Sequence, residues 1–165
     1  MCEEITYKIW TVVMIQDGDK VLLLDRQHDH FKGFIPPGGR VEFPESFVNA
    51  AIREVKEETG LEVRNLVFKG ISEFVNPAVN KRYIMMNYWT KDYTGELLED
   101  PPEGELNWVN IEEAKDLPMQ EDIKIRFNLF FELGTFEIQT VWNEEKNSPE
   151  KIFIKKPNSL LQLVR

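Results

Sequence analysis

One stretch of the chain, from Gly38 to Leu61, constrains the fold more than any other part of the sequence. It reads GGRVEFPESFVNAAIREVKEETGL and begins with paired glycines, which let a backbone turn tightly or approach a ligand closely. A helix is predicted from about Pro44 to Thr59, because proline suits a first helical turn and Gly60 suits the left-handed position just after a helix end. The stretch therefore predicts a loop, a helix and a sharp exit.

The predicted helix gathers three acids on one side. Glu54 lies beside both Glu57 and Glu58, since residues three and four apart on a helix are neighbours. Like charges at this spacing cost roughly a few tenths of a kcal/mol per pair. A divalent cation would offset that cost, and Mg²⁺ commonly combines carboxylates with substrate phosphates. The acids therefore indicate a metal site, and the alternative is an ordinary solvated face. An adjacent apolar stripe is expected to face the core: Phe47, Val48, Ala51, Ile52 and Val55.

The loop before the helix, PPGGR, suits a phosphate group. Gly38 and Gly39 allow the backbone N–H groups to come close to a ligand. Cations around this loop are candidate phosphate contacts, although each is equally an ordinary surface charge: Arg26, Lys32 and Arg40. His28 and His30 could bind a metal ion or touch phosphate, but the sequence offers no third ligand beside them. Acids beside a glycine loop indicate diphosphate chemistry.

The whole stretch resembles the signature box of the Nudix hydrolases. Every position of that box fits, at Gly39, Glu45, Arg53, Glu54, Val55, Glu57, Glu58, Gly60 and Leu61. The resemblance implies an α/β (α+β) fold in which a mixed β-sheet is sandwiched between helices. It also implies that Glu54, Glu57 and Glu58 bind Mg²⁺, for which Mn²⁺ can substitute.

The resemblance further implies a reaction, the hydrolysis of a nucleoside diphosphate linked to another group. Water attacks phosphorus, and metal ions stabilise the charge that develops on the phosphate oxygens. A carboxylate would orient or deprotonate the water, and Glu57 and Glu103 are both candidates. Arg53 belongs to the catalytic machinery as the residue that holds loop and helix together, and Glu45 and Gly60 support the box.

Glu103 comes from a second stretch, EGELNWV (103–109). It resembles the acidic loop before a tryptophan-containing strand in the MutT-type branch, where a glutamate five residues before the tryptophan completes the metal site. Glu103 stands five residues before Trp108. Glu105 competes for this role, and a solvated loop acid is the alternative for Glu103.

A third stretch, KDLPMQEDIKIRF (115–127), resembles the vertebrate 8-oxo-dGTP diphosphatases. There a bulky residue and two adjacent acids enter the last helix, and here these are Met119, Glu121 and Asp122. The resemblance implies that the acids bond the polar edge of a purine, and that one of them is protonated and shares its proton with its neighbour. The alternative is that they only cap the helix and favour its dipole.

The chain departs from that branch at the position where an asparagine commonly reads the base. Ile35 stands there and cannot bond a base edge, although its neighbour Phe34 could stack on a base. Phe74 corresponds to an aromatic pocket residue of the branch. The base selectivity is therefore less well predicted than the chemistry.

Three function classes follow. The first is hydrolysis of oxidised purine nucleoside triphosphates, such as 8-oxo-dGTP, to monophosphate and pyrophosphate. The second is a Nudix hydrolase of ADP-ribose, a capped RNA end or a dinucleoside polyphosphate. Pro77 gives weak support for ADP-ribose, and the tyrosine expected of dinucleoside polyphosphate hydrolases at a similar distance is missing. The third is a non-catalytic nucleotide-sensing module, a class that usually loses the box carboxylates, whereas this chain retains them.

Bulk properties set outer limits. The chain has 165 residues and a net charge of −9, which fits a single domain and argues against binding to duplex nucleic acid. It has one cysteine, Cys2, and apolar runs too short for a membrane span, so we expect a cytoplasmic protein. We assign 1–156 to the Nudix hydrolase domain and 157–165 to a C-terminal tail. The sequence predicts a small nucleotide as partner and leaves the oligomeric state open.

The remaining elements follow from local patterns. Strands are expected at 5–15, 21–25, 61–75, 82–90, 106–111, 134–143 and 151–156. A turn is expected at Asp17-Gly18, and helical segments at 112–117 and 121–133. Strands and helices interspersed in this way indicate a mixed sheet.

Overall fold

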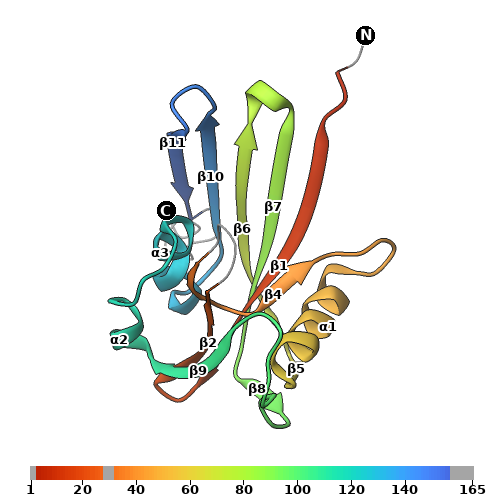
Figure 1. Ribbon diagram of the computed structural model, residues 1–165, viewed down its shortest axis with the longest axis vertical. Helices are drawn as coiled ribbons and strands as arrows, with labels where there is room; N and C mark the ends of the chain where they lie inside the picture. The colour runs from red at the N-terminus through yellow and green to blue at the C-terminus, as the bar shows by residue number, and fades with distance from the viewer. Residues whose placement is uncertain (1–2, 28–31, 157–165) are drawn as a thin grey trace, which may run out of the picture.

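A large mixed β-sheet forms the body of the protein in a computed structural model, which describes residues 3–27 and 32–156 (Figure 1). Cys2, His28, His30 and the predicted tail 157–165 lie outside the described residues. The strands are β1 (Thr6–Asp17), β2 (Lys20–Arg26), β3 (Gly33–Ile35), β4 (Gly38–Arg40), β5 (Glu62–Arg64), β6 (Val67–Asn76), β7 (Lys81–Thr90), β8 (Asp92–Thr94), β9 (Glu105–Asn110), β10 (Phe136–Asn143) and β11 (Ser148–Lys155). The helices are α1 (Phe47–Thr59), α2 (Ile111–Ala114) and α3 (Glu121–Phe127), with the 3₁₀ segments η1 (Pro77–Val79) and η2 (Asn128–Phe131).

Strand β1 organises the sheet. It pairs in parallel with β7 and antiparallel with the short β4, which carries the paired glycines. Beyond β7 the order continues through β6 and β10 to the edge strand β11, and β10 pairs in parallel with β6. The predicted hairpin leads from β1 into β2, which then turns away and pairs with β3 and β9. Parallel and antiparallel pairs together confirm the predicted mixed sheet.

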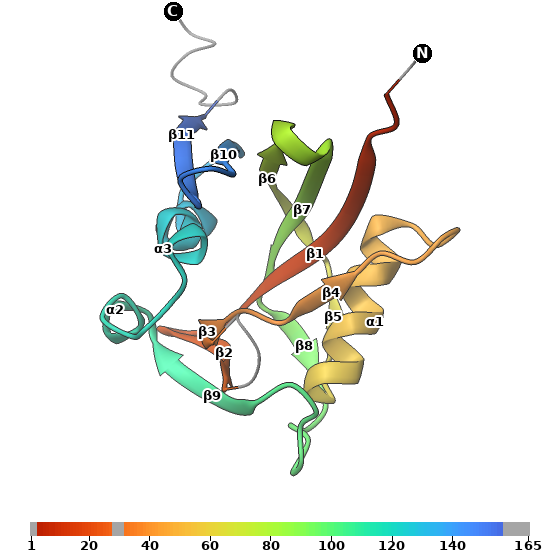
Figure 2. The ribbon, with the colours of Figure 1, turned by 45° about the horizontal axis from the view of Figure 1, so that its top comes forward.

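Successive side chains of β1 point to opposite faces of the sheet and belong to two hydrophobic cores, one on each face. Val13 and Ile15 point to the face covered by α1, where they pack with Val55. Val12 and Met14 point to the opposite face, which is covered by α3 and η2. Figure 2 shows α1 and α3 on opposite sides of the strands. The expected arrangement of a sheet between helices is therefore confirmed.

Helix α1 begins later than predicted. Ser46 is its N-cap and accepts a hydrogen bond from the Asn49 N–H, so Pro44 lies in the loop before the helix. Gly60 ends the helix with a positive φ of 84°, as predicted. The predicted apolar stripe is wrong in its first turn, because Phe47 and Val48 are 40% and 42% exposed. Phe47 borders an open groove of about 400 Å³ beside the start of β1 rather than the core.

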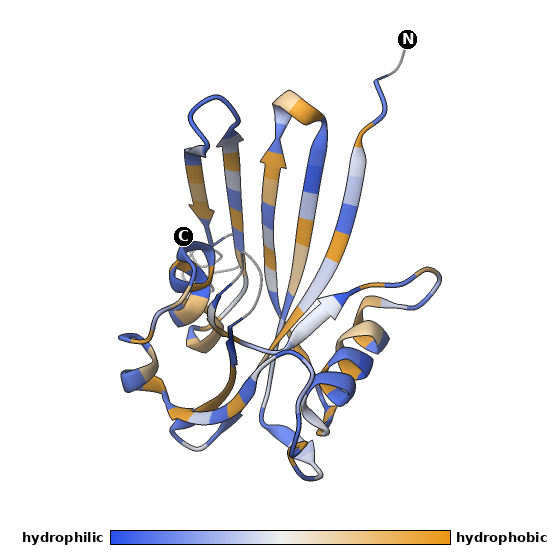
Figure 3. Cartoon of the chain, in the orientation of Figure 1, coloured by the Kyte–Doolittle hydropathy of each residue, from blue (hydrophilic) through white to orange (hydrophobic). Residues whose placement is uncertain are grey.

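The strands extend past the helices at one end of the molecule. The upper ends of β1, β6, β7, β10 and β11 project beyond α1 and α3 in both ribbon views (Figures 1 and 2). Hydrophobic and hydrophilic residues alternate along these ends, as Figure 3 shows. Apolar side chains at this end are exposed, among them Ile152, Phe153 and Ile154 of β11.

Candidate active site

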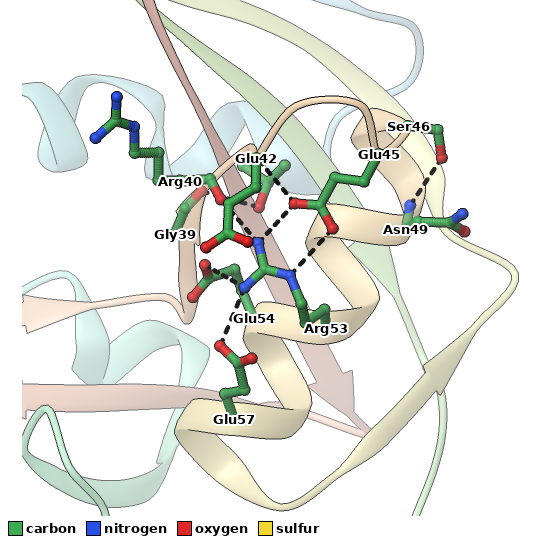
Figure 4. A network of polar contacts seen from close by, with 10 residues as sticks. Gly39, Arg40, Glu42, Glu45, Ser46, Asn49, Arg53, Glu54 and Glu57 are labelled. Atoms are coloured by element: carbon green, nitrogen blue, oxygen red, sulfur yellow. Dashed lines mark hydrogen bonds and ion pairs between the residues drawn. The ribbon is translucent and has the colours of Figure 1, made fainter.

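Arg53 is the centre of a polar network on α1 (Figure 4). Its Nη2 and Nε donate to the two oxygens of Glu45 at 2.6 and 3.0 Å, a bidentate contact that ties the helix to its preceding loop. Its Nη1 donates to Glu54 at 2.8 Å and to Glu57 at 3.0 Å. Its Nη2 also donates to the Arg40 carbonyl at 2.9 Å. Arg53 therefore connects the box loop to two of the predicted metal ligands.

The same contacts shift the acid–base properties of the network. The hydrogen bond from Arg53, together with one from the Glu42 N–H, lowers the pKa of Glu45 to about 2. The reciprocal bond from Arg53 to Glu45 is the main reason that the pKa of Arg53 is raised above its ordinary value. Both groups are thus charged over the whole working range of pH, and they form a permanent ion pair.

Each of the paired glycines allows a close approach, Gly38 to the backbone of β1 and Gly39 to the Glu54 carboxylate. A Cβ added to Gly39 would lie 2.1 Å from a carboxylate oxygen of Glu54. A Cβ added to Gly38 would lie 2.0 Å from the Thr11 carbonyl oxygen of β1. The Gly38 N–H donates to Glu58 at 2.9 Å. Close approach of backbone and carboxylates is therefore the structural reason for glycine at both positions.

Two acids on this side of α1, Glu54 and Glu58, have raised pKa values. Burial, together with the nearby charges of Glu54 and Glu103, raises the pKa of Glu58 to about 8, against the hydrogen bond from the Gly38 N–H. Burial likewise raises the pKa of Glu54, although Arg53 opposes that shift. Carboxylates drawn together out of water disfavour their own ionisation. A bound cation would remove this penalty, so the donor set fits a hard divalent metal ion.

The predicted metal ligands do not converge in this structure. Glu54 and Glu57 turn toward Arg53, whereas Glu58 turns toward Gly38. Within residues 3–27 and 32–156, no three His, Cys, Asp or Glu side chains lie close enough together to hold a metal ion. Metal binding would therefore require side-chain rotation, which is easiest for Glu57, whose side chain is 57% exposed.

The loop before β9 brings Glu103 to the same place. Glu103 pairs with Arg26 at the end of β2 at 3.7 Å, and its charge acts on Glu58. Gly104 holds the chain against β2, since a Cβ there would lie 2.4 Å from the Asp25 carbonyl oxygen. Glu105 lies on β9 and is exposed. Of the two competing acids, Glu103 is the one that interacts with the α1 acids.

The predicted base-reading residues collect at the start of α3. Met119 is buried in the core on the α3 face, and Phe34 and Ile35 pack against the same core. The Phe34 N–H donates to the Pro118 carbonyl at 2.9 Å, which ties β3 to the segment before α3. Glu121 and Asp122 occupy the first turn of α3 and are exposed. The structure thus brings Phe34, Ile35 and Met119 into one apolar cluster and leaves Glu121 and Asp122 exposed at the start of α3.

Phe74 lies elsewhere, in a row of aromatic rings on the projecting sheet. It stacks on Tyr83 at 5.8 Å and lies 5.5 Å from Trp142, measured between ring centroids. Trp10 meets Tyr83 edge-on at 5.2 Å, and Lys8 lies over the same Tyr83 ring. Only Phe74 was predicted from the sequence. The other rings alternate with polar residues in their strands, which is the pattern of any half-buried strand.

A buried arginine was also missed. Arg126 on α3 is 2% exposed, donates to the Ser72 hydroxyl and lies 3.5 Å from Asp122. Asn87 donates to the same hydroxyl at 3.1 Å. Asn87 Oδ1 and Arg126 Nε have no hydrogen-bond partner among the described residues. The signal in the sequence was weak, because Arg126 stands in a polar segment where arginine is normally solvated.

Comparison with protein families matches residues 7–129 to the NUDIX domain family. The chain belongs to the Nudix family. An uncharacterised Nudix hydrolase of Bacillus subtilis (strain 168), YvcI, is 32% identical over 112 residues, which cover 66% of this chain and 70% of that protein. An asymmetrical bis(5′-nucleosyl)-tetraphosphatase of Rattus norvegicus is 28% identical over 127 residues, 74% of this chain and 86% of that protein.

A solved Nudix structure agrees with the fold. The mutator MutT protein of Bacillus halodurans superposes with a TM-score of 0.78 and 26% identity, covering 90% of this chain and 97% of that one. The Nudix chain is accordingly a pyrophosphohydrolase that acts on nucleoside diphosphate derivatives, and Nudix hydrolases generally need divalent metal cations. The helices of the described residues are too short or too polar to cross a membrane.

Proposed function

We propose that residues 1–156 form a catalytic domain that hydrolyses oxidised purine nucleoside triphosphates, with 8-oxo-dGTP as the substrate, to monophosphate and pyrophosphate. The observation that carries the chemistry is the contact network of the box, in which Arg53 donates to Glu54 and Glu57 and the Gly38 N–H donates to Glu58. A bound divalent cation would favour the ionised form of these carboxylates. The 8-oxo-dGTP assignment draws its support from the start of α3 and from the likeness to the Bacillus halodurans MutT protein.

The metal-binding residues in this proposal are Glu54, Glu57, Glu58 and Glu103. They would hold Mg²⁺, with Mn²⁺ as a substitute, and the bound metal would supply positive charge for the phosphate oxygens. Glu57 exchanges its contact with Arg53 for this role. Glu57 and Glu103 remain the two candidates for the base that orients the attacking water.

The diphosphate would lie along β4. The Gly39 backbone lies against Glu54, the Gly38 N–H donates to Glu58, and Arg40 is exposed at the end of the strand. Arg26 approaches the same acids from β2 through its pair with Glu103. These cations would balance the charge of the phosphates.

The base would bind between β3 and the start of α3. Phe34 and Ile35, which are partly exposed, offer an apolar surface for the ring, and the buried Met119 packs in the same core. Glu121 and Asp122 offer acceptors for the N–H groups of the base. An oxidised purine presents one more N–H on its five-membered ring than the normal base. Two adjacent acceptors would therefore favour binding of the oxidised purine over the normal base.

A second candidate substrate is a dinucleoside polyphosphate, and the aromatic row favours it. Trp10 lies directly across from Arg40 in the β1–β4 pairing, so the row Trp10, Tyr83, Phe74 and Trp142 begins beside the proposed phosphate site. Stacked aromatic rings are suitable surfaces for a nucleobase. One relative is named as an asymmetrical bis(5′-nucleosyl)-tetraphosphatase.

The remaining alternatives have narrower support. A relative from Methanocaldococcus jannaschii named as an ADP-ribose pyrophosphatase is 49% identical, but over only 49 residues, 29% of this chain. A capped RNA end rests on the family alone. A non-catalytic sensing module is disfavoured because every box carboxylate is present.

A hydrolysis panel tests the proposal. The purified chain is incubated with Mg²⁺ or Mn²⁺ and with 8-oxo-dGTP, dGTP, ADP-ribose, diadenosine tetraphosphate or capped RNA, and the products are separated by chromatography. We expect the highest kcat/KM for 8-oxo-dGTP, with pyrophosphate as a product. A preference for dGTP would refute the base assignment, and a preference for diadenosine tetraphosphate would select the second candidate.

A further inference from the structure

A cavity of about 760 Å³ opens on the α3 face of the sheet, away from the box. It lies between the end of β1, the start of β6, the end of β7, α2 and the segment that follows η2. Its lining includes Lys69, Trp89 and Phe131, with Phe68 and Leu133 among the apolar residues around them. The residues that we assign to metal, phosphate and base are absent from the described lining, so the cavity is separate from the proposed active site.

Lys69 is the unusual group in this cavity. It is 6% exposed, although lysine is a strongly hydrated side chain that is almost never buried without a partner. Its ammonium donates to the Glu132 carbonyl at 2.5 Å. An ammonium carries three N–H donors, and this carbonyl is the one acceptor found for it among residues 3–27 and 32–156.

The charges around the cavity leave Lys69 without a dedicated carboxylate. Glu112 and Glu132 both line the cavity, but Glu112 pairs with Lys115 at 2.8 Å and Glu132 pairs with Lys156. Burial lowers the pKa of Lys69, and the charge of Glu132 opposes that shift only in part. A buried cation whose hydrogen bond goes to a neutral carbonyl is complementary to an anion that enters the cavity.

A purely structural role explains only some of these facts. Lys69 could serve to neutralise the carbonyl end of η2, where positive charge is favourable. That role needs neither burial nor a cavity, since an exposed lysine performs it without losing hydration. Nor does it explain the apolar rim, where Leu133 is 92% exposed.

We propose that this cavity binds a small aromatic anion, with its charged group at Lys69 and its ring against Trp89 and Phe131. The indole of Trp89 is fixed for this contact, because its Nε1 donates to Gln16 Oε1 at 2.9 Å. Aromatic walls favour a planar body, and an ammonium serves equally for a carboxylate or a phosphate. The ligand class is therefore an aryl carboxylate or an aryl phosphate.

Isothermal titration calorimetry on the full chain tests the site with benzoate and phenyl phosphate. Benzyl alcohol replaces the anion with a neutral group, and inorganic phosphate removes the ring. We expect the two aromatic anions to bind and both control compounds to bind at least about ten-fold more weakly, since a hydrogen bond to a charged group is lost in one case and the apolar contact in the other. The stronger of the two anions identifies the preferred headgroup. Equal binding of benzyl alcohol, or the absence of binding by both anions, would overturn the proposal.

Two variants locate the binding. Lys69→Met should weaken benzoate binding about ten-fold or more, whereas Lys20→Met, at an exposed lysine on β2, should leave it unchanged. Leu133→Glu adds a negative charge at an exposed position and should weaken binding without unfolding the chain, with Leu133→Gln as its neutral control. If Lys69→Met does not fold, the comparison of Leu133→Glu with Leu133→Gln still tests whether the ligand binds in this cavity. Binding that is the same in Leu133→Glu and Leu133→Gln would contradict the site.

Discussion

Helices α1 and α3 both carry adjacent acids, but they hold them in different ways. On α1 the acids are fixed by close contacts: Glu54 lies against Gly39, Glu58 accepts from Gly38, and Arg53 bridges to the loop. On α3, Glu121 and Asp122 stand exposed in the first turn. Glu54 and Glu58 are held in place and have raised pKa values, whereas Glu121 and Asp122 stay exposed, with Asp122 3.5 Å from Arg126.

Under the proposed function, this difference corresponds to two tasks of a hydrolase. Chemistry on a diphosphate needs groups placed in advance, because each misplaced charge raises the barrier. Choice of a base needs only a few acceptors at the rim of an apolar wall. The comparison predicts that substitutions on α1 change the rate strongly and that substitutions on α3 change mainly the ratio between substrates.

The largest effect is expected for Glu57→Gln. It removes a proposed metal ligand and candidate base, so kcat should fall by about 10²–10⁴-fold while the fold is retained, because Glu57 is exposed. Steady-state kinetics with saturating Mg²⁺ measure it. Glu62→Gln, at an exposed glutamate just past the helix, should leave kcat unchanged. Intact turnover in Glu57→Gln would show that the metal-site assignment is wrong.

A smaller effect is expected for Gly39→Ala. The added methyl group collides with the Glu54 carboxylate and pushes it away from its position, so kcat/KM should fall about 10–100-fold. Gly18→Ala serves as a control, because it introduces backbone strain at a positive φ of 59° in an open turn far from the acids. That variant should lose stability but keep its turnover. If Gly39→Ala and Gly18→Ala behave alike, the glycine does not position Glu54.

Asp122→Asn should act on selectivity. It exchanges an acceptor for a group that also donates, so the preference for 8-oxo-dGTP over dGTP should fall about ten-fold while kcat for dGTP stays nearly constant. Competition assays with both nucleotides measure this ratio directly. Glu113→Gln, at an exposed glutamate on α2, is the control. An unchanged ratio in Asp122→Asn would leave Asp122 as a helix-capping residue alone.

The smallest effect concerns stability in acid. The pKa of Glu45 is about 2 in the folded chain against 4.5 for the ordinary group, so its ion pair with Arg53 stabilises the fold above pH about 4.5 and loses this contribution as the pH falls toward 2. Denaturant unfolding at several pH values should show Glu45→Gln less stable than the parent at neutral pH, with the difference vanishing near pH 2. A difference that is independent of pH would contradict the ion-pair origin.

The sequence predicted the box well because its determinants are local. The exit glycine and the acid spacing lie within one helix, where spacing alone sets geometry, whereas the start of the helix was placed too early, at Pro44 instead of after the Ser46 cap. Other element boundaries were predicted wrongly where contacts with other segments determine the structure. The expected strand 61–75 is divided into β5 and β6 at Asn65, which adopts a positive φ of 51°. The expected helix 121–133 ends as α3 at Phe127 and continues as η2.

The short strands and the buried polar groups could not be predicted in the same way. Strands β3 and β4 have three residues each, and their identity as strands depends on partners in β2 and β1. The same holds for Lys69 and Arg126, whose burial is decided by segments distant in the chain. A single sequence gives the residue types, but it does not show which distant segments bury these side chains.

The position of β1 has a consequence for how the protein is made. Thr6 pairs with Lys81 and Ile15 pairs with Thr90, so this first strand has to wait for β7. At a synthesis rate of about 5–20 residues per second, that interval is on the order of ten seconds. During this time the nascent chain already contains the complete glycine loop and box helix, but not the strand that braces β1 on its other side. The box segment is thus translated early, and the sheet around it is completed only when the middle of the chain has emerged.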